Sequence, residues 1–409
     1  MSGMKLHAFF PAQPAPTLDF APAAMTLDAD ARFALEVTVD IGGVVAFEPV
    51  LRAFVRRPND HRHLAGRDTH QDGLLLPWLP QGRWRFRLEG NAALTPGPYE
   101  LGVSVGDLDG AYAERLLPFA IERAAHGEPV ASLRFDADAD TRARLAALSW
   151  NGGLDDWFNR HFCHAAKTIA EQFLRNAPQL RGRILDIGAG DGITDLGIFL
   201  RYQPEQLVAV DIVDYMQRLP DVARRSGLPL AGLPERMQLH RGTCEAMPFV
   251  DGYFDLVLSW GSVEHVKGGY RRTLDEVWRV LKPGGLFFVN PGLYYSAFGS
   301  HLGEFSTDPH LHLKVGEDAL RAIVMGSEPR RMDRSGFDAP REEYWRFYKE
   351  LNRIRIADFE RELRSYGYEI VRGALRTSEV VEYDAALQPY SLVDLAVEDA
   401  YYTLRKPEK

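Results

Sequence analysis

Large apolar side chains alternate with polar or small ones over much of the first third of the chain. The first run covers residues 33–39 and ends at Gly42-Gly43. Similar runs cover 50–56, 82–89, 99–105 and 116–122. Alternation at period two is typical of half-buried strands, and no helical pattern lies between these runs. The segment 31–122 is therefore predicted to be an all-β, immunoglobulin-like sandwich.

The segments around this sandwich lack such alternation. Residues 1–30 are rich in Pro and Ala, which predicts a loose leader with room for one edge strand. Residues 123–150 are predicted to be a linker with an acidic stretch and a short helix at 141–148. Helical spacing begins at 154–175, so we expect a second domain in residues 151–409.

A short buried strand leads into a glycine-rich turn in this second domain. The apolar run 184–187 is followed by Gly188, Gly190 and Gly192 in alternation and then by a helical pattern at 194–202. Strand, glycine turn and helix begin a nucleotide-binding βαβ unit, because glycines let the backbone turn tightly and approach a ligand closely. The spacing G-x-G-x-G differs from the dinucleotide fingerprint G-x-G-x-x-G, which disfavours an oxidoreductase.

Strand and helix patterns alternate after the glycine turn. Strands are predicted at 206–210, 237–240, 254–259, 286–289, 368–371 and 401–404, and helices at 270–281 and 342–366. This alternation predicts an α/β domain around a mostly parallel sheet. Asp211 ends the second strand about 20 residues beyond the turn, where a carboxylate can accept hydrogen bonds from both ribose hydroxyls of a nucleotide.

The composition excludes several classes of protein. A formal net charge of −9 argues against a general nucleic-acid binder, which needs a basic field. No apolar run approaches the ~18 residues of a membrane span, and residues 1–16 lack the pattern of a signal peptide. Two cysteines are too few for a disulfide scaffold. These features predict a cytoplasmic protein, and a homo-oligomer stays open.

Five groups of residues in the second domain follow one another at characteristic intervals. They are Leu185–Gly192, Val210-Asp211, Met247-Pro248-Phe249 with Phe254–Val257, Val263–Val266 and Val280–Gly285. Together they resemble the motifs of a class I S-adenosylmethionine-dependent methyltransferase. The resemblance implies a Rossmann-like domain with a seven-stranded sheet and an antiparallel last strand, and S-adenosylmethionine as the cofactor.

The resemblance also implies cofactor contacts, carried over position by position. The expected cofactor-binding residues are Asp186, Gly188, Ala189, Gly190, Gly192, Asp211, Ile212, Thr243, Cys244, Glu245, Ser259 and Trp260. Many relatives have Asp where Thr243 stands, to accept a hydrogen bond from the adenine amino group. Either the threonine hydroxyl accepts that bond more weakly or Glu245 replaces it.

A long insertion, residues 290–366, follows the fifth strand of the domain and is expected to cover the acceptor, because ligands bind at the carboxyl ends of such strands. The expected substrate-binding residues are Tyr294, Tyr295, His301, Glu304 and His312. Three readings stay open: an acceptor pocket with a histidine base, a metal site built from His301, His310 and His312, or a lid whose polar residues satisfy its own backbone. We expect no metal.

A hydroxyl acceptor loses a proton during methyl transfer, and histidine suits that role because its pKa lies near neutrality. His265 is the first candidate base, because it follows the fourth strand of the domain. His301 and His310 are the alternatives, and a structural hydrogen bond is the competing role for His265.

Two short segments of the predicted sandwich, Gly66–Thr69 and Leu94–Leu101, resemble the carbohydrate-binding sandwich of O-antigen-exporting ABC transporters. This resemblance implies glycan binding, whereas a structural or oligomerising sandwich is the competing reading. Trp78, Trp84 and Tyr112 would either stack on sugar rings or fill the core.

The combined expectation is a methyltransferase that O-methylates a sugar of a surface polysaccharide or of its lipid-linked precursor. A glycan or glycolipid is thus the expected acceptor. One alternative is a methyltransferase for a small molecule or lipid, with the sandwich as an accessory domain. Another is a glycan-binding protein without catalysis.

Overall fold

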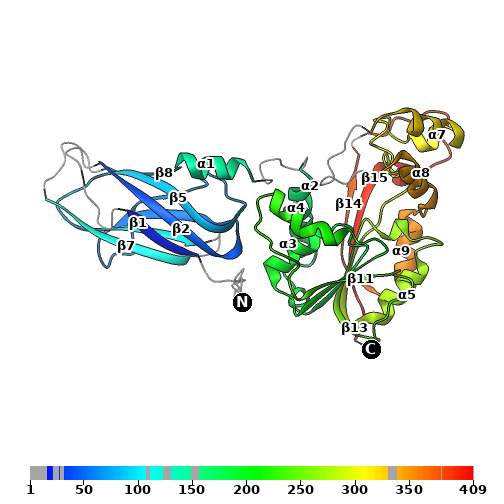
Figure 1. Cartoon of the computed structure of the whole chain (residues 1–409), viewed down its shortest axis with the longest axis horizontal. Coiled ribbons are helices and arrows are strands. Elements are labelled where there is room, and N and C mark those ends of the chain that lie inside the picture. Colours follow the sequence, from blue (N-terminus) through cyan, green and yellow to red (C-terminus); the bar gives the residue numbers. More distant parts are fainter. Residues whose placement is uncertain are drawn as a thin grey trace. The chain divides into compact units, whose positions relative to one another are not determined.

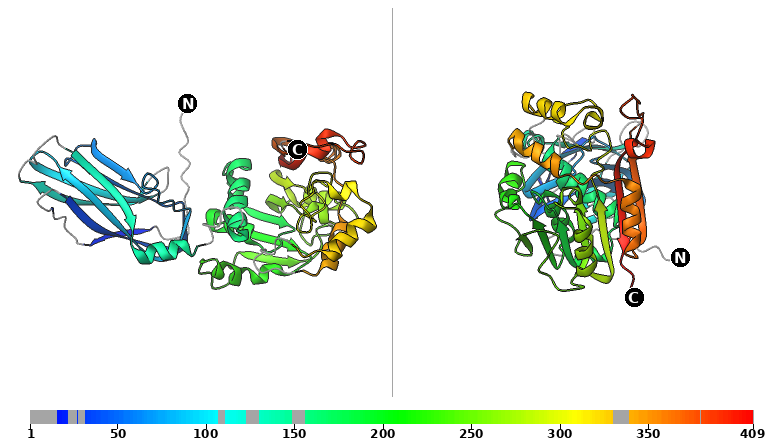
Figure 2. Two further views of the ribbon diagram at one scale, coloured as in Figure 1. Left: turned by 90° about the horizontal axis from the view of Figure 1, so that it is seen from above. Right: turned by 90° about the vertical axis from the view of Figure 1, so that its right-hand side faces the viewer.

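The computed structural model describes residues 16–21, 27, 32–106, 111–122, 130–148, 156–329, 339–378 and 380–408. The chain divides into two compact units (Figures 1 and 2). The first comprises 1–153 and 223–231, and the second comprises 154–222 and 232–409. No helix among the described residues is long and apolar enough to cross a membrane.

The first unit contains two antiparallel four-stranded sheets, which agrees with the all-β prediction. One sheet has the order β1 (Thr17–Ala21), β2 (Arg32–Phe47), β5 (Trp78–Ala93) and β8 (Val130–Ala137). The other has the order β4 (His63–Asp68), β3 (Val50–Arg56), β6 (Gly97–Gly106) and β7 (Ala111–Ile121). In β2 the burial alternates as the sequence pattern predicts, with Phe33 and Leu35 buried and Ala34 exposed.

Three features of this unit differ from the sequence expectations. The strand predicted from the run at 33–39 does not end at Gly42-Gly43, because β2 continues past a register shift to Phe47. Residues 130–137 are not linker, because β8 pairs with β5 along its whole length and buries Leu133 and Phe135. The helix expected at 141–148 begins earlier, as α1 (Ala139–Ala146), because Asp138 in the acidic stretch is its N-cap and accepts a hydrogen bond from the Thr141 backbone N–H.

Two of the aromatic residues considered for sugar stacking lie in the core instead. Trp78 and Trp84 are 0% and 1% exposed. The indole N–H of Trp84 donates to the Pro80 carbonyl, and Arg144 covers its ring at 3.8 Å. The side chain of Tyr112 lies outside the described residues. Neither tryptophan offers a face to a glycan.

The second unit is built on a seven-stranded sheet. Its order is β11 (Met237–Arg241), β10 (Gln206–Asp211), β9 (Arg183–Ile187), β12 (Phe254–Trp260), β13 (Leu281–Asn290), β15 (Val397–Arg405) and β14 (Glu369–Thr377). β15 runs antiparallel to both of its neighbours, whereas β9 to β13 pair in parallel. This arrangement confirms the expected α/β fold with an antiparallel last strand.

Helices cover both faces of this sheet, which explains the nearly continuous apolar runs of its central strands (Figure 1). One face carries α3 (Ile193–Tyr202) and a helical segment that begins as α2 (Trp157–Asn159) and continues in the wider turns Arg160–Ala165 and Thr168–Phe173. The other face carries α5 (Arg271–Val280) and α9 (Ile356–Ser365), whose apolar side chains share one core with β12 and β13. The remaining helices are α4 (Leu219–Arg225), α6 (Leu311–Lys314), α7 (Glu317–Gly326), α8 (Arg341–Glu350) and α10 (Leu392–Ala396).

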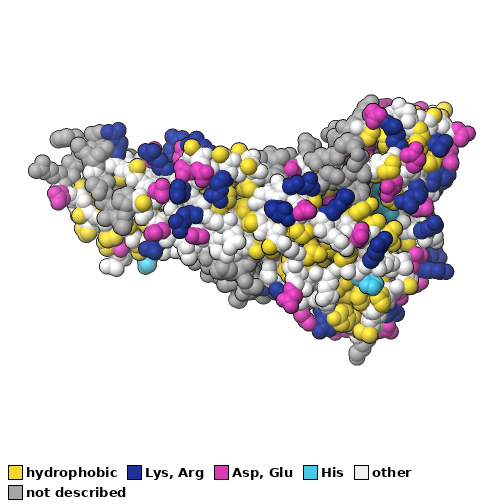
Figure 3. Space-filling model, in the orientation of Figure 1, with side chains coloured by type: hydrophobic (Ala, Val, Ile, Leu, Met, Phe, Trp, Pro, Cys, Tyr) yellow, Lys and Arg dark blue, Asp and Glu magenta, His cyan; other side chains and the backbone are white. Residues whose placement is uncertain are grey.

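The insertion after β13 has a small core of its own. Its members come from the loop after β13, from α7, from α8 and from the residue that follows α8: Tyr294, Leu302, Phe305, Leu320, Val324, Tyr344, Tyr348 and Leu351. On the face shown in Figure 3, acidic and basic side chains are interspersed among the described residues.

The predicted long helix at 342–366 is instead two helices, α8 and α9, separated at Leu351–Arg355. At this break, the backbone N–H of Asn352 donates to the Glu264 carbonyl at 2.7 Å rather than to the preceding helical turn. A tertiary hydrogen bond therefore ends α8 where the local sequence pattern would continue it.

Candidate active site

The glycine turn after β9 is closed on one side and open on the other. Gly188, Gly190 and Gly192 have φ angles of 76°, 56° and 73°, a region that favours glycine. A Cβ on Gly188 would stand 2.2 Å from Ser262 Cβ, whereas a Cβ on Gly190 would meet no atom within 4 Å. The turn thus packs against the loop after β12 and leaves open space beside Gly190.

Asp211 lies next to this open space. Its Oδ2 accepts a hydrogen bond from the Gly190 backbone N–H at 2.8 Å, and Gly188 N–H donates to the Val210 carbonyl. The turn is thereby tied to the carboxyl end of β10. Ile212, which follows, is 65% exposed. An accessible carboxylate beside an unobstructed glycine backbone fits the ribose and amino-acid parts of S-adenosylmethionine.

The residues expected around the adenine form a compact turn after β11. The Thr243 hydroxyl donates to Glu245 Oε2 at 3.1 Å and accepts from the Glu245 backbone N–H at 3.2 Å. Cys244 points toward α5, with its Sγ 3.3 Å from Thr273 Oγ1, and burial raises the pKa of its thiol. Because Thr243 and Glu245 act as one hydrogen-bonded unit, the structure leaves both as candidates for the adenine contact.

The residues expected near the reacting methyl group lie at the end of β12. Ser259 is fully buried, and its Oγ lies 2.7 Å from Ser262 Oγ. Ser262 Oγ also donates to the Ile187 carbonyl at 2.7 Å. Trp260 stacks on Phe288 with ring centroids 6.0 Å apart. These contacts fix the β12 loop against the glycine turn.

Two residues that sequence reasoning did not single out cover the glycine turn. The indole N–H of Trp157, on α2, donates to Asp191 Oδ2 at 2.7 Å. The His161 ring is tilted against that of Trp157, with centroids 4.2 Å apart, and burial lowers the pKa of its imidazole. The helical spacing at 154–175 predicted a helix in this region, but no local signal pointed to this tryptophan.

Asp186 faces a second buried carboxyl group, that of Asp195 on α3. Asp186 is 8% and Asp195 is 1% exposed. Burial raises the pKa of Asp186 to about 7 and the pKa of Asp195 well above its usual range. If both carboxyl groups were ionised, neither oxygen of Asp195 would have a hydrogen-bond donor among the described residues. One shared proton supplies that donor and removes one of the two buried charges.

This carboxyl pair predicts a pH dependence of stability. An unfolded aspartate loses its proton near pH 4, whereas burial raises the pKa of Asp186 to about 7 and that of Asp195 well above its usual range, so the folded pair still holds a proton above pH 4. The folded state therefore binds more protons in this window, and the free energy of unfolding falls as the pH rises through it. Asp195→Asn removes the second charge and can donate to Asp186. We expect the variant to be more stable than the wild type by about 1–4 kcal/mol at pH 8 and nearly equal at pH 4.

Urea unfolding of both proteins across pH 4–8 measures this difference. Parallel stability curves for Asp195→Asn and the wild type would show that the pair does not hold a proton. Asp140→Asn, on the exposed side of α1, is the matched control and should leave the curve unchanged.

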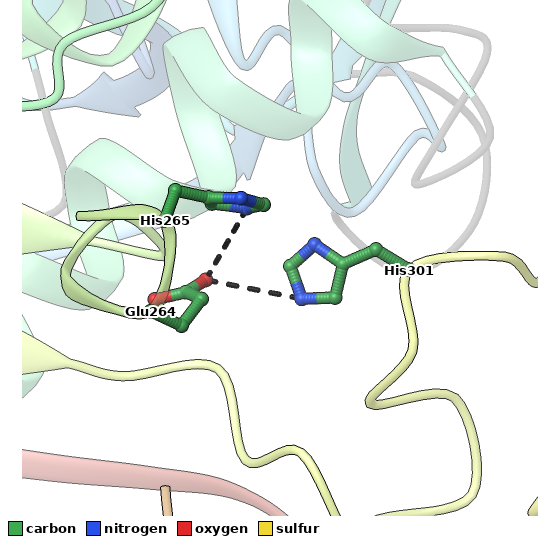
Figure 4. A group of neighbouring side chains, drawn as sticks. All are labelled: Glu264, His265 and His301. Atoms are coloured by element: carbon green, nitrogen blue, oxygen red, sulfur yellow. Dashed lines mark ion pairs between the residues drawn. The ribbon is translucent and has the colours of Figure 1, made fainter. Parts of the chain in front are cut away.

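Three side chains meet where the acceptor is expected (Figure 4). Glu264 and His265 belong to the 3₁₀ turn Val263–His265 after β12, and His301 lies in the insertion after β13. Glu264 Oε1 is 3.8 Å from His265 Nε2 and 3.9 Å from His301 Nε2. Both imidazoles are 35% exposed, whereas the Glu264 side chain is 2% exposed. The structure thus brings together two of the three predicted base candidates, and it adds Glu264.

The side chain of Asn352 holds the turn Val263–His265 in place through hydrogen bonds. Its side-chain N–H groups donate to the carbonyls of Val263, Glu264 and Val266 at 3.0–3.2 Å. Phe347 on α8 contacts the edge of the His265 ring, with centroids 6.2 Å apart. The segment 341–352 therefore forms one wall beside the histidines.

Removal of the Asn352 side chain is expected to loosen the turn. Asn352→Ala removes the side-chain donor from three carbonyls and leaves that of Val263 without this bond, whereas the Glu264 carbonyl keeps the Asn352 backbone N–H and the Val266 carbonyl keeps that of Gly269. We expect a loss of about 1–3 kcal/mol of stability. Because small displacements of reacting groups are costly, we also expect turnover to fall by about 10–100-fold with unchanged cofactor affinity. Asn176→Ala is the control. It removes a side-chain hydrogen bond from the Tyr202 hydroxyl to Asn176, at positions far from Asn352 in the sequence. Wild-type turnover in Asn352→Ala would exclude a positioning role.

The other expected histidines, His310 and His312, are engaged in contacts with backbone carbonyls. His310 and His312 are buried and contact the carbonyls of Leu395 at 3.0 Å and Tyr294 at 2.7 Å. Burial lowers the pKa of His312 to about 4, which keeps it neutral. These contacts favour packing roles over a base role for His310 and a substrate contact for His312.

Tyr294, Tyr295 and Glu304 are the remaining residues predicted to bind the substrate. The Tyr294 hydroxyl lies 3.3 Å from the Tyr348 hydroxyl in the insertion core. Tyr295 is half-buried, with Arg355 over its ring at 4.1 Å. Glu304 is also half-buried. They stay candidates for acceptor contacts.

The metal site considered from the sequence is not formed. Among the described residues, the ligand atoms of Glu264, His265 and His301 are the group that lies within 4.8 Å of one another. His310 and His312 do not belong to it, because their rings are directed to backbone carbonyls.

Comparison with known proteins finds similarity in part of the sheet of the second unit and in its loops. Residues 185–289 match the family model of a methyltransferase domain. The ubiquinone/menaquinone biosynthesis C-methyltransferase UbiE of Geobacter sulfurreducens is 35% identical over 106 residues, which are 25% of this chain and 39% of that enzyme. The uncharacterized methyltransferase YcgJ of Bacillus subtilis is 34% identical over 108 residues, 26% of this chain and 39% of that protein. The chain thus spans less than half the length of these relatives.

Solved structures of methyltransferases also align with the chain. The crystal structure of Bacillus subtilis YcgJ covers 60% of this chain and 99% of that one, with 17% identity and a TM-score of 0.37. Geranyl diphosphate methyltransferase in complex with S-adenosylmethionine covers 59% of this chain and 85% of that one, with 13% identity and a TM-score of 0.36.

The family match over residues 185–289 agrees with the expectation of a methyltransferase domain within residues 151–409. It includes the glycine turn, Asp211 and the turn at Val263–His265. Together with the open cradle beside Gly190, the match supports S-adenosylmethionine as the cofactor.

Proposed function

We propose that this chain transfers a methyl group from S-adenosylmethionine to a hydroxyl of a carbohydrate acceptor, in a surface polysaccharide or its lipid-linked precursor. The observation that carries the proposal is the cluster of Glu264, His265 and His301. It belongs to loops at the ends of β12 and β13, and the β12 loop packs directly on the glycine turn through Ser262.

The residues of the cofactor side would bind and orient S-adenosylmethionine. Asp211 would accept hydrogen bonds from the ribose hydroxyls, and the backbone at Gly188–Gly192 would hold the amino-acid end. S-adenosylmethionine, when bound, supplies an electrophilic methyl group. The turn Val263–His265 is fixed relative to the glycine turn by hydrogen bonds, and such fixed alignment can lower a barrier by about 7–11 kcal/mol.

The residues of the acceptor side handle a proton. An alcohol is a poor nucleophile while it keeps its proton, and a positioned proton acceptor contributes a factor of about 10²–10⁴. The half-exposed imidazoles of His265 and His301 can reach an incoming hydroxyl, and Glu264 Oε1 lies 3.8 and 3.9 Å from their Nε2 atoms. Phe347 beside His265 offers an apolar surface to the acceptor.

The carbohydrate part of the proposal is supported by the resemblance of the first unit to a glycan-binding sandwich. Its two antiparallel sheets agree with that architecture. A second candidate is a small-molecule acceptor, because relatives of the matched segment are named as methyltransferases of quinones and, in Actinopolyspora halophila, of glycine and its methylated derivatives.

Methyl-labelled S-adenosylmethionine and fractionated bacterial extract test the acceptor class. Label in polysaccharide or lipid-linked glycan, dependent on His265, would support the proposal. Label confined to quinones, amines or free lipids would favour the second candidate. Cofactor binding without any transfer would contradict the proposed activity.

A further inference from the structure

Glu264 is a buried carboxylate whose nearest charged neighbours are the imidazoles of His265 and His301. Among the described residues, neither of its oxygens has a hydrogen-bond donor, although its side chain is 2% exposed. A buried ionised carboxylate is costly unless it is paired or coordinates a metal. The surrounding backbone nevertheless makes room for it: a Cβ on Gly292 would stand 2.5 Å from Glu264 Oε1.

The distances around this carboxylate are slightly longer than those between ligand atoms about a common centre. At 3.8 and 3.9 Å, the two Glu264–histidine separations are too long for direct hydrogen bonds. Bonds of about 2.1 Å to one ion place neighbouring ligand atoms about 3.0–3.5 Å apart. Small side-chain movements would therefore close the three ligand atoms, which already lie within 4.8 Å of one another, around an ion.

His301 reaches this position through an unusual backbone conformation. Its φ is 57°, in the left-handed region that is uncommon for residues other than glycine. Non-glycine residues held in this region occur at ligand and catalytic sites, where the surrounding structure maintains the strain. The conformation is an observation independent of the Glu264 carboxylate.

We infer that Glu264, His265 and His301 bind a divalent transition-metal ion. Two imidazole nitrogens and one carboxylate oxygen suit Zn²⁺, Fe²⁺ or Mn²⁺ better than Mg²⁺, which prefers oxygen ligands alone. Three protein ligands leave coordination positions open, and the 35% exposure of both imidazoles places the site within reach of solvent. This assignment departs from the sequence expectation of no metal.

The role of the ion in catalysis rests on the proposed function, whereas its binding does not. An acceptor hydroxyl in an open coordination position would be oriented by the ion, and its pKa would be lowered. The imidazoles would then act as ligands, and the ion would promote release of the hydroxyl proton. Without an ion, one imidazole would accept that proton directly.

Metal content of the full chain tests the site. The protein is stripped with a chelator, incubated with Zn²⁺, Mn²⁺ or Mg²⁺ in turn, dialysed and measured by elemental analysis. We expect about one Zn²⁺ or Mn²⁺ per chain, no retained Mg²⁺, and at least a tenfold loss of affinity in Glu264→Gln and in His301→Ala. His164→Ala removes an exposed histidine of the same unit and should bind metal as the wild type does.

Thermal unfolding gives a second readout that is independent of activity. A saturating ion should raise the Tm of the wild type by about 5 °C or more and leave the Tm of Glu264→Gln unchanged. Equal metal retention by wild type and Glu264→Gln, or none by either, would overturn the site. If methyl transfer persists in metal-free protein, the catalytic role of the ion fails, while the proposed function stands and the site is decided by metal retention. If metal binds but no acceptor is methylated, the metal site stands and the proposed function fails.

Discussion

Replacement of His265 by alanine is expected to lower kcat by about 10²–10⁴ and to leave the Kd for S-adenosylmethionine unchanged. The imidazole lies at the acceptor side of the β12 loop, 3.8 Å from Glu264, and it takes no part in the hydrogen bonds that hold the glycine turn. His301→Ala should have a similar effect, because both rings face the same carboxylate. The measurements are initial rates of methyl transfer and cofactor binding by calorimetry.

The double variant makes this expectation sharper. If the two histidines serve one proton-handling cluster, His265→Ala with His301→Ala should lose little more activity than the more damaged single variant, because residues that act as a unit are non-additive. Full activity in both single variants would contradict the role of the cluster. A parallel loss of cofactor affinity would instead assign His265 to the cofactor side.

Gly190→Ala is expected to fold and to bind S-adenosylmethionine about 10–100-fold more weakly. The φ of Gly190 is 56°, and an alanine there costs about 1–2 kcal/mol. Its Cβ would meet no protein atom within 4 Å, so it would project into the open space assigned to the cofactor. A methyl group that overpacks a binding site costs about 1–3 kcal/mol, which corresponds to that loss of affinity.

Gly188→Ala provides the contrast. Its Cβ would stand 2.2 Å from Ser262 Cβ at a φ of 76°. We expect about 2–4 kcal/mol of destabilisation, because strain and a clash with the β12 loop add. Circular dichroism, Tm and cofactor Kd distinguish the two variants. Wild-type cofactor affinity in a well-folded Gly190→Ala would move the cofactor away from the glycine turn.

The sequence was sufficient for the sheet of the second unit but not for all of its surroundings. Buried parallel strands leave continuous apolar runs, so β9, β10 and β12 could be located from residue type alone. The division of 342–366 into α8 and α9 could not be found in this way. It depends on hydrogen bonds from Asn352 to residues 86–89 positions earlier, which leave no trace in local periodicity.

The candidate site shows the same limit. Sequence proximity grouped His301 with His310 and His312, which the fold directs to separate backbone carbonyls. The fold instead groups His301 with Glu264 and His265, because β12 and β13 are adjacent parallel strands whose carboxyl ends meet. His265 could be predicted from its place after a strand, whereas Glu264 required the knowledge that its side chain is buried.

The most direct test of the account is a crystal structure of the full chain with S-adenosylhomocysteine bound. We predict the ribose hydroxyls at the Asp211 carboxylate, the amino-acid end along Gly188–Gly192 and the sulfur directed toward the cluster of Glu264, His265 and His301. A ligand bound elsewhere, or bound with its sulfur directed away from that cluster, would contradict the claim that these loops form one methyl-transfer site.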